Sequence, residues 1–237
     1  VYNAAKSGDA IVVSGLQMPS IADPRTFSYV SVASNGAGAE AAVATPVLTG
    51  QPLPHACVPL ADGSLLLMDM TINRLSPTLG IQASYSATLT QAASTLGNNA
   101  EDLLAGRGAQ LYGATLAPDG KLYLFGAKQI PADLAANKPA TIQPALFRFN
   151  TDGTLDTSFN LALGNQLTAL QGHSIDQVQF DAQGRLYVNA VKGLIRLSST
   201  GSLDTSFGTN GLMVPMDLDP IREDLLSSFR LDGQRIY

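Results

Sequence analysis

Short apolar runs separated by glycine-containing turns recur along the chain. The clearest are Leu122–Leu124, which follows Asp119-Gly120, and Leu186–Val188, which follows Gln183-Gly184. Runs of this length, bounded by turn residues, are typical of β-strands. A turn dipeptide such as Asp-Gly between two apolar runs indicates a β-hairpin, and a type I′ turn needs positive φ at both central residues. The pattern therefore predicts a series of antiparallel hairpins.

The hairpin pattern is part of a longer repeat. Residues 115–124 match residues 179–188, and weaker copies lie around Asp62-Gly63, around Asp232-Gly233 and over residues 6–13. Aligning these copies predicts that the first strand of successive units starts near residues 1, 56, 111, 175 and 225. Self-similarity at a fixed period is the signature of repeat architectures, so this periodicity determines the interpretation of the fold.

A second string follows two of the hairpins. Gly-Thr-Leu-Asp-Thr-Ser-Phe at 153–159 recurs as Gly-Ser-Leu-Asp-Thr-Ser-Phe at 201–207, each after an apolar-Arg-apolar triplet. Each unit is interpreted as four strands. In the fourth unit we expect these strands at about Ile175–Phe180, Arg185–Ala190, Leu194–Leu197 and Leu203–Phe207. Four antiparallel strands recurring about every 40–50 residues are typical of a β-propeller blade.

This string resembles the delta-60 repeat, a bacterial repeat family predicted to build β-propellers. The resemblance is sharp over 115–159 and 179–211, where Phe207–Gly211 matches the family's ending, and degenerate over 1–86. It implies the fold and frequent export, and it supplies no known catalytic residues. Asp156 and Asp204 are expected to close the turn into the fourth strand. Ser158 and Ser206 are expected to bond to local backbone.

The predicted fold is an all-β β-propeller of four-stranded antiparallel blades, with about 4–5 blades in this chain. It is either a single domain or an excerpt of a larger ring. The blades are placed at approximately 1–50, 51–105, 106–165, 166–215 and, incomplete, 216–237. Because the last unit stops at Tyr237, its open edge needs the N-terminus, the rest of a longer polypeptide or another chain as a partner. The first residues already form a strand in this scheme, which favours the excerpt.

Three departures from the strand pattern are expected. An insertion, Lys128–Pro144, separates the second and third strands of the third unit. The candidate helix is Ser94–Ala105, where Asn98, Asn99 and Glu101 can cap a short turn. A further insertion is expected at Ala37–Gln51.

The composition of the chain argues against nucleic acid as a partner and against a membrane span. The net charge is −5 and no short segment concentrates Lys or Arg, which argues against nucleic acid. No apolar run is long enough to span a bilayer, and no signal-peptide pattern is visible. Charged residues make up only 14% of the chain, and its start at Val1 suggests a trimmed form. We therefore expect a secreted, periplasmic or cell-surface bacterial protein. The lone Cys57 is interpreted as a structural thiol.

Candidate ligand-binding residues lie near the predicted start of the first strand of each unit, where propellers open to their axial channel. They are His55, Arg107, Tyr112, His173 and Asp176. Two histidines with a carboxylate can bind a metal, although no tight ligand spacing is present and the metal stays unknown. No cofactor motif, phosphate loop or catalytic elbow is recognised, so no cofactor and no catalytic residue are assigned.

Three functional hypotheses follow. The first is a non-catalytic secreted or surface-displayed module that binds protein or glycan at the propeller face or the insertions. The second is a metal-dependent hydrolase or lactonase-like enzyme that uses the axial channel. The third is an assembly subunit whose open last blade is completed by a neighbouring chain.

Overall fold

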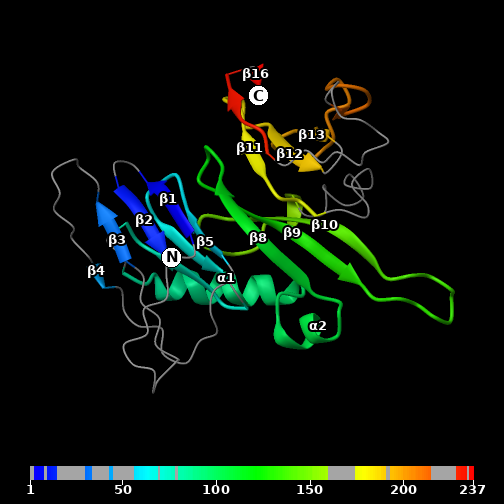
Figure 1. Cartoon of the computed structure of the whole chain (residues 1–237), viewed down its shortest axis with the longest axis horizontal. Helices are drawn as coiled ribbons and strands as arrows, with labels where there is room; N and C mark the ends of the chain where they lie inside the picture. Colours follow the sequence, from blue (N-terminus) through cyan, green and yellow to red (C-terminus); the bar gives the residue numbers. More distant parts are fainter. Residues whose placement is uncertain are drawn as a thin grey trace. The chain divides into compact units, whose positions relative to one another are not determined.

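Antiparallel sheets make up most of the structure in this computed structural model (Figure 1). It describes residues 3–7, 10–14, 30–33, 43–44, 56–68, 70–77, 80–159, 174–190, 193–214, 228–233 and 235–237. Two compact units, Val1–Thr90 and Gln91–Tyr237, divide the chain within a helix. Among the described residues, no helix is both long and apolar enough to span a membrane.

The first unit contains two antiparallel sheets. One has the strand order β1-β2-β3-β4 and the other β5-β6-β7. The strands are β1 Asn3–Ser7, β2 Ala10–Ser14, β3 Val30–Ala33, β4 Val43–Ala44, β5 Ala56–Pro59, β6 Leu65–Met68 and β7 Ile72–Leu75. All four residues of β6 are buried, so this central strand forms the core of its sheet.

A helix covers the outer edge of β7. Helix α1, Ala83–Thr95, places two hydroxyls one turn apart against this edge. The Ser86 hydroxyl accepts from the Arg74 N–H at 2.9 Å, and the Thr90 hydroxyl accepts from the Ile72 N–H at 2.8 Å. The Thr90 hydroxyl also donates to the Ile72 carbonyl at 3.2 Å. These side chains satisfy backbone groups that a fourth strand would otherwise pair.

Helix prediction was only partly right. Helix α2, Ala100–Leu104, is capped by Asn99, whose side chain accepts from the Asp102 N–H, as predicted. Helix α1 begins well before the predicted segment and was missed. It carries no charged residue and is rich in Ser and Thr, which are poor helix formers. The helix is stabilised by its contacts with β7, which the periodicity of its own sequence does not reveal.

The first sheet of the second unit has the order β10-β9-β8. Its strands are β8 Ala109–Leu116, β9 Leu122–Ile130 and β10 Thr141–Phe149. The pairing of β9 with β10 runs from Phe149↔Leu122 to Thr141↔Ile130. The two ends of the expected insertion Lys128–Pro144 continue the ladder, and residues 131–140 between them leave the sheet as an exposed connection (Figure 1). The predicted insertion between the second and third strands is therefore present but shorter than predicted, because its exposed ends continue the strands without an apolar alternation.

The next sheet has the order β11-β12-β13-β14. Its strands are β11 Val178–Phe180, β12 Leu186–Ala190, β13 Gly193–Leu197 and β14 Leu212–Met213. The first three predicted strands of this unit are thus present with shorter or shifted ends. The fourth is wrong, because Leu203 makes only an isolated bridge with Leu197 and the chain then turns. Strand β14 takes the edge instead, pairing Ile195 with Leu212.

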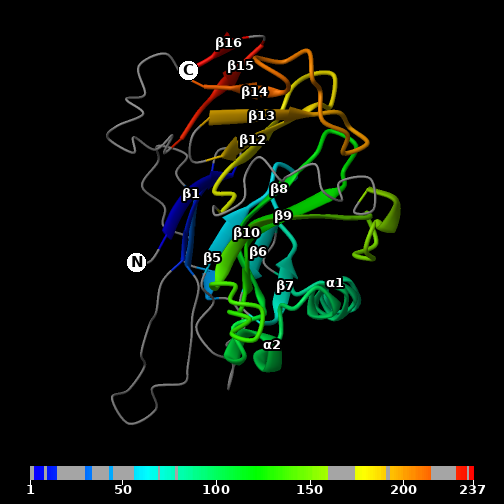
Figure 2. The same cartoon turned by 90° about the vertical axis from the view of Figure 1, so that its right-hand side faces the viewer.

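The last described hairpin is β15 Leu231–Asp232 with β16 Arg235–Ile236. Two glutamine side chains, one in β11 and one just before it, hydrogen-bond to the backbone that leads into this hairpin. The Gln177 amide accepts from the Phe229 N–H at 2.9 Å and donates to the Phe229 carbonyl at 2.9 Å. The Gln179 amide bonds the Phe229 carbonyl and the Leu231 N–H in the same way. The hairpin lies at the β12–β13 end of the unit in both views (Figure 2).

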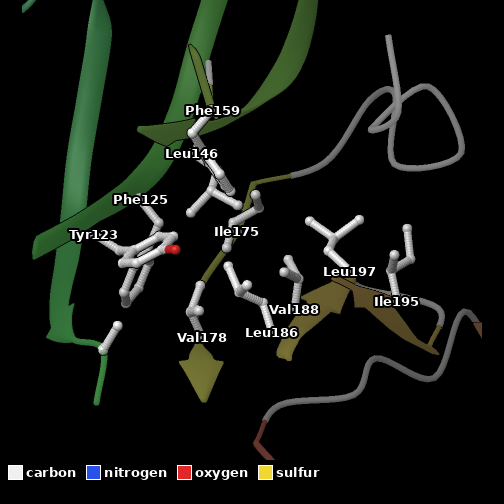
Figure 3. Close-up of a cluster of buried hydrophobic side chains, with 11 residues drawn as sticks. Tyr123, Phe125, Leu146, Phe159, Ile175, Val178, Leu186, Val188, Ile195 and Leu197 are labelled. Carbon is white, nitrogen blue, oxygen red and sulfur yellow. The ribbon is translucent and has the colours of Figure 1, made fainter. Parts of the chain in front are cut away.

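A hydrophobic cluster joins the β8–β10 sheet to the β11–β14 sheet. Figure 3 shows side chains from both sheets pointing toward one another around Ile175. The fully buried members include Tyr123, Phe159, Leu186, Val188 and Leu197. Burying aromatic and aliphatic side chains of this size stabilises a fold by about 1.5–3 kcal/mol each. The cluster therefore fixes the position of the two sheets within the second unit.

Candidate functional site

The aspartate of the repeated string, Asp156, belongs to a charged network with Arg148 of β10 and Lys121. Asp156 Oδ2 accepts from Arg148 Nε at 3.0 Å and from Lys121 Nζ at 2.5 Å. Asp156 Oδ1 accepts from the Ser158 hydroxyl at 2.6 Å and the Phe159 N–H at 3.2 Å. Asp156 thus closes a turn, as predicted, but the turn leads into helical residues 157–159 and not into a fourth strand. The predicted serine-to-backbone bond is wrong, because the hydroxyl bonds the carboxylate instead.

The Arg148 guanidinium completes this network. It lies 4.3 Å from the centre of the Phe159 ring, donates to the Tyr123 hydroxyl at 3.3 Å and donates to the Ser199 carbonyl at 2.5 Å. Ser199 belongs to the following repeat, so one arginine ties two repeats together. The sequence carried the signal, an arginine eight residues before each repeated aspartate, and it was not interpreted as a pair.

A second copy of the network lies in the following repeat. Arg196 Nε donates to Asp204 Oδ2 at 2.8 Å, and its guanidinium lies 4.7 Å from the Phe207 ring centre. Asp204 Oδ1 accepts from the Ser206 hydroxyl at 2.6 Å, and Arg196 Nη1 donates to the Tyr187 hydroxyl at 3.4 Å. The recurrence of the same contacts marks these residues as structural parts of the repeat.

Electrostatics agree with a structural role. Burial raises the pKa of Asp156, but hydrogen bonds from Lys121 and Ser158, with the charge of Arg148, hold this pKa far below the usual carboxylate range. The Ser206 hydroxyl contributes most to lowering the pKa of Asp204, and Arg196 adds to it. Carboxylates held ionised in this way are poor general acids or bases near neutral pH. Neither is a candidate catalytic group.

The predicted ligand-binding residues separate into three groups. His55 and His173 lie outside the described residues. Arg107 is exposed, pairs with Asp102 at 3.5 Å and lines an open pocket of about 350 Å³ beside α2. Tyr112 and Asp176 each adjoin a residue that pairs with or bonds to Gly126, namely Leu111 and Ile175. Within the described ranges, no cluster of three His, Cys, Asp or Glu side chains could hold a metal.

Tyr112 is the extra residue of a β-bulge. In the β8–β9 ladder Leu111 pairs with Gly126 and Gly113 with Phe125, which leaves Tyr112 without an opposite residue. A bulge re-aims a side chain at a strand edge, and the Tyr112 ring is 46% exposed. The glycine in the strand was the signal that could have predicted the bulge.

Two glycines make this geometry possible. A Cβ on Gly113 would lie 2.4 Å from the Phe125 ring, and a Cβ on Gly126 would lie 2.0 Å from the Gln110 carbonyl oxygen. The bulged strand therefore approaches β9 more closely than any other residue type would allow. The Gly126 carbonyl also accepts from the Ile175 N–H at 2.9 Å. That bond holds the segment carrying Asp176 beside the bulge.

The Tyr112 hydroxyl contacts one polar side chain, and the charge of Asp176 acts on it as well. The Tyr112 hydroxyl donates to Gln110 Oε1 at 3.2 Å, and Asp176 Oδ1 accepts from the Ser174 hydroxyl at 2.8 Å. Burial, then the nearby charge of Asp176, raises the pKa of Tyr112, so its hydroxyl stays protonated at neutral pH. We call Gln110, Tyr112, Ser174 and Asp176 the bulge surface. It combines an aromatic face with an amide, a hydroxyl and a carboxylate.

Comparison with known proteins matches one segment of the chain to a known family. Residues 141–159 match a family described as "Domain of unknown function (DUF5122) beta-propeller". The match covers β10 and the string that ends at Phe159, including the Arg148–Asp156 pair. No similar sequence was found among curated proteins. The matched segment is thus similar to a β-propeller repeat.

Proposed function

We propose that this chain is a run of delta-60-type β-propeller repeats that acts as a non-catalytic binding module outside the bacterial cytoplasm. The observation that carries the proposal is the bulge surface. There an exposed aromatic ring, an amide and a carboxylate lie together where the β8–β9 ladder meets the segment leading into β11. Tyrosine offers rigid, amphipathic contact area at low entropic cost, which favours recognition.

The contacts of the repeated string support a binding role for residues outside the string. The charged groups of the repeated string bond one another, so they build the sheets and leave recognition to residues outside the string. The match to a β-propeller family supports four-stranded blades as the architecture. The low charge of the chain is compatible with the proposed secreted, periplasmic or surface location. The expected partners are protein or glycan.

A binding survey of the purified protein tests the proposal. The labelled chain is applied to immobilised glycans and to peptides of varied charge, and wild type is compared with Tyr112→Ala. We expect saturable binding to one class, weakened by the substitution. In parallel, lactone and ester hydrolysis is measured with and without added divalent metal. Metal-dependent turnover without saturable binding would overturn the proposal in favour of the hydrolase.

A further inference from the structure

The bulge determines what the bulge surface can recognise. Tyr112 has no opposite residue in β9, although paired residues of the ladder flank it on both sides, and its side chain is 46% exposed. The backbone beneath it is fixed by the close approach at Gly126, where the Gln110 carbonyl leaves no room for a side chain. A preorganised ring of this kind loses little entropy when a ligand packs on it.

The polar groups beside the ring have unused hydrogen-bonding capacity. Gln110 uses Oε1 to accept from Tyr112, which leaves its amide N–H groups to donate. Ser174 occupies only Oδ1 of Asp176. Among the described residues Asp176 Oδ2 has no hydrogen-bond partner, and Asp176 is exposed. The bulge surface therefore offers a hydrogen-bond acceptor on Asp176 and a donor on Gln110 beside an exposed aromatic side chain.

From this arrangement we infer that the bulge surface binds a neutral saccharide. The inference rests on the proposed binding function and names its ligand class. A pyranose ring presents an apolar C–H face that packs on tyrosine, and its hydroxyls bond the Asp176 carboxylate and the Gln110 amide. Hydrogen bonds to a carboxylate are stronger than neutral ones. The negative charge of Asp176 disfavours uronic or sialic acids, because like charges repel.

A cationic peptide is the competing ligand, since carboxylate and ring also attract ammonium or guanidinium groups. The observations favour sugar because the amide and hydroxyl of Gln110 and Ser174 add neutral hydrogen-bonding positions. A surface specialised for a cation would gain little from them. The two ligands differ in salt dependence, because screening weakens charge attraction and leaves ring packing nearly unchanged.

Titration calorimetry and NMR with neutral oligosaccharides test the inference on the full chain. We expect Tyr112→Ala to weaken binding about tenfold or more through the lost ring contact. Asp176→Asn should weaken it by about tenfold. Tyr112→Phe, which keeps the ring, should change it by only about two- to threefold. Leu134→Ser on the β9–β10 turn, where Leu134 is 90% exposed, is the matched control and should leave binding unchanged.

Each outcome has a definite meaning. Affinity that is lost in Tyr112→Ala, kept in Leu134→Ser and insensitive to salt supports the inference. Sugar binding that survives both Tyr112→Ala and Asp176→Asn overturns this site while leaving the proposed function intact. Binding of basic peptides alone, weakened by salt, overturns the saccharide assignment. If the chain binds neither class, the proposed function fails with it.

Discussion

The two copies of the arginine–aspartate network share a sequence string but differ in their surroundings. In the earlier copy the Arg148 and Asp156 side chains are 10% and 7% exposed. In the later copy the Arg196 and Asp204 side chains are 15% and 22% exposed. Both copies share the bond from arginine Nε to aspartate Oδ2 and the bond from the serine hydroxyl to aspartate Oδ1. The comparison teaches that the string specifies the contacts, whereas neighbouring residues set how strongly those contacts stabilise the fold.

Two additional contacts distinguish the earlier copy. Lys121 adds a second cation to Asp156, and Arg148 reaches the Ser199 carbonyl in the following repeat. Within the described part of the chain, the later copy has neither contact. Losing either cation removes a charge-assisted hydrogen bond from Asp156 at a site where water replaces it poorly, although the other cation still compensates the carboxylate.

The largest effect is expected from removing the arginines. We expect Arg148→Ala to lower the free energy of unfolding by about 3–5 kcal/mol, because it breaks a buried ion pair and the tie to Ser199. Arg196→Ala should cost about 1–2 kcal/mol, through one more exposed pair and its packing on Phe207. Urea unfolding followed by circular dichroism measures both values.

Hydrogen exchange supplies the local readout for these variants. Arg148→Ala should increase exchange in both β10 and the turn that contains Ser199, whereas Arg196→Ala should affect β13 alone. Arg107→Ala, which removes an exposed pair at 3.5 Å, is the control and should change stability by less than about 0.5 kcal/mol. Equal losses for Arg148→Ala and Arg196→Ala would contradict the argument that the two additional contacts of the earlier copy set the difference.

The next effect depends on pH. The pKa of Asp156 lies far below its usual range in the folded chain, despite the opposing effect of burial. Such a group contributes stability that is fully present above the unfolded pKa, about 3.9, and is lost as pH falls toward the folded pKa. We expect Asp156→Asn to cost about 2–3 kcal/mol at pH 7. The difference in the free energy of unfolding between this variant and wild type should shrink steadily below about pH 4.

Asp204→Asn provides the matched comparison at the more exposed copy. Its pKa is lowered in the same direction, chiefly by the Ser206 hydroxyl, so its gap to wild type should shrink over a similar range. The gap itself should be smaller, because solvent screens the exposed pair. Urea midpoints at closely spaced pH values between 2 and 7 measure both. A pH-independent gap for Asp156→Asn would show that the carboxylate charge is not what stabilises this copy.

The sequence predicted the hairpins well because their signal is local. Leu116 and Leu122 flank a glycine turn in the structure, as the pattern requires. The turn type was wrong: Gly120 has φ 81°, but Asp119 is not among the described residues with positive φ. Its side chain instead accepts from the Lys121 N–H at 3.0 Å. One glycine and an aspartate side chain thus replace the two-residue turn that was expected.

The features that were missed depend on tertiary contacts. Helix α1 is held by hydroxyls that bond the edge of β7, and no periodicity in the helix itself encodes that partner. The pairing of Arg148 with Asp156 required knowing that the chain reverses after β10. At the candidate site, the sequence identified Tyr112 and Asp176 separately, but their proximity depends on the bulge and on the Ile175–Gly126 bond.

The smallest expected effect comes from the serines, and it tests which residues cause the difference in stability between the two copies. Ser158 and Ser206 both donate to Oδ1 of their aspartate at 2.6 Å, and both are exposed. Water can replace either hydroxyl, so each Ser→Ala substitution should cost about 1 kcal/mol or less. We expect the two losses to agree within about 0.5 kcal/mol, measured by urea unfolding. A loss at Ser158 that is several times larger would mean that the whole earlier network is strengthened by burial, and that the difference does not lie in the arginine and its contact with the next repeat alone.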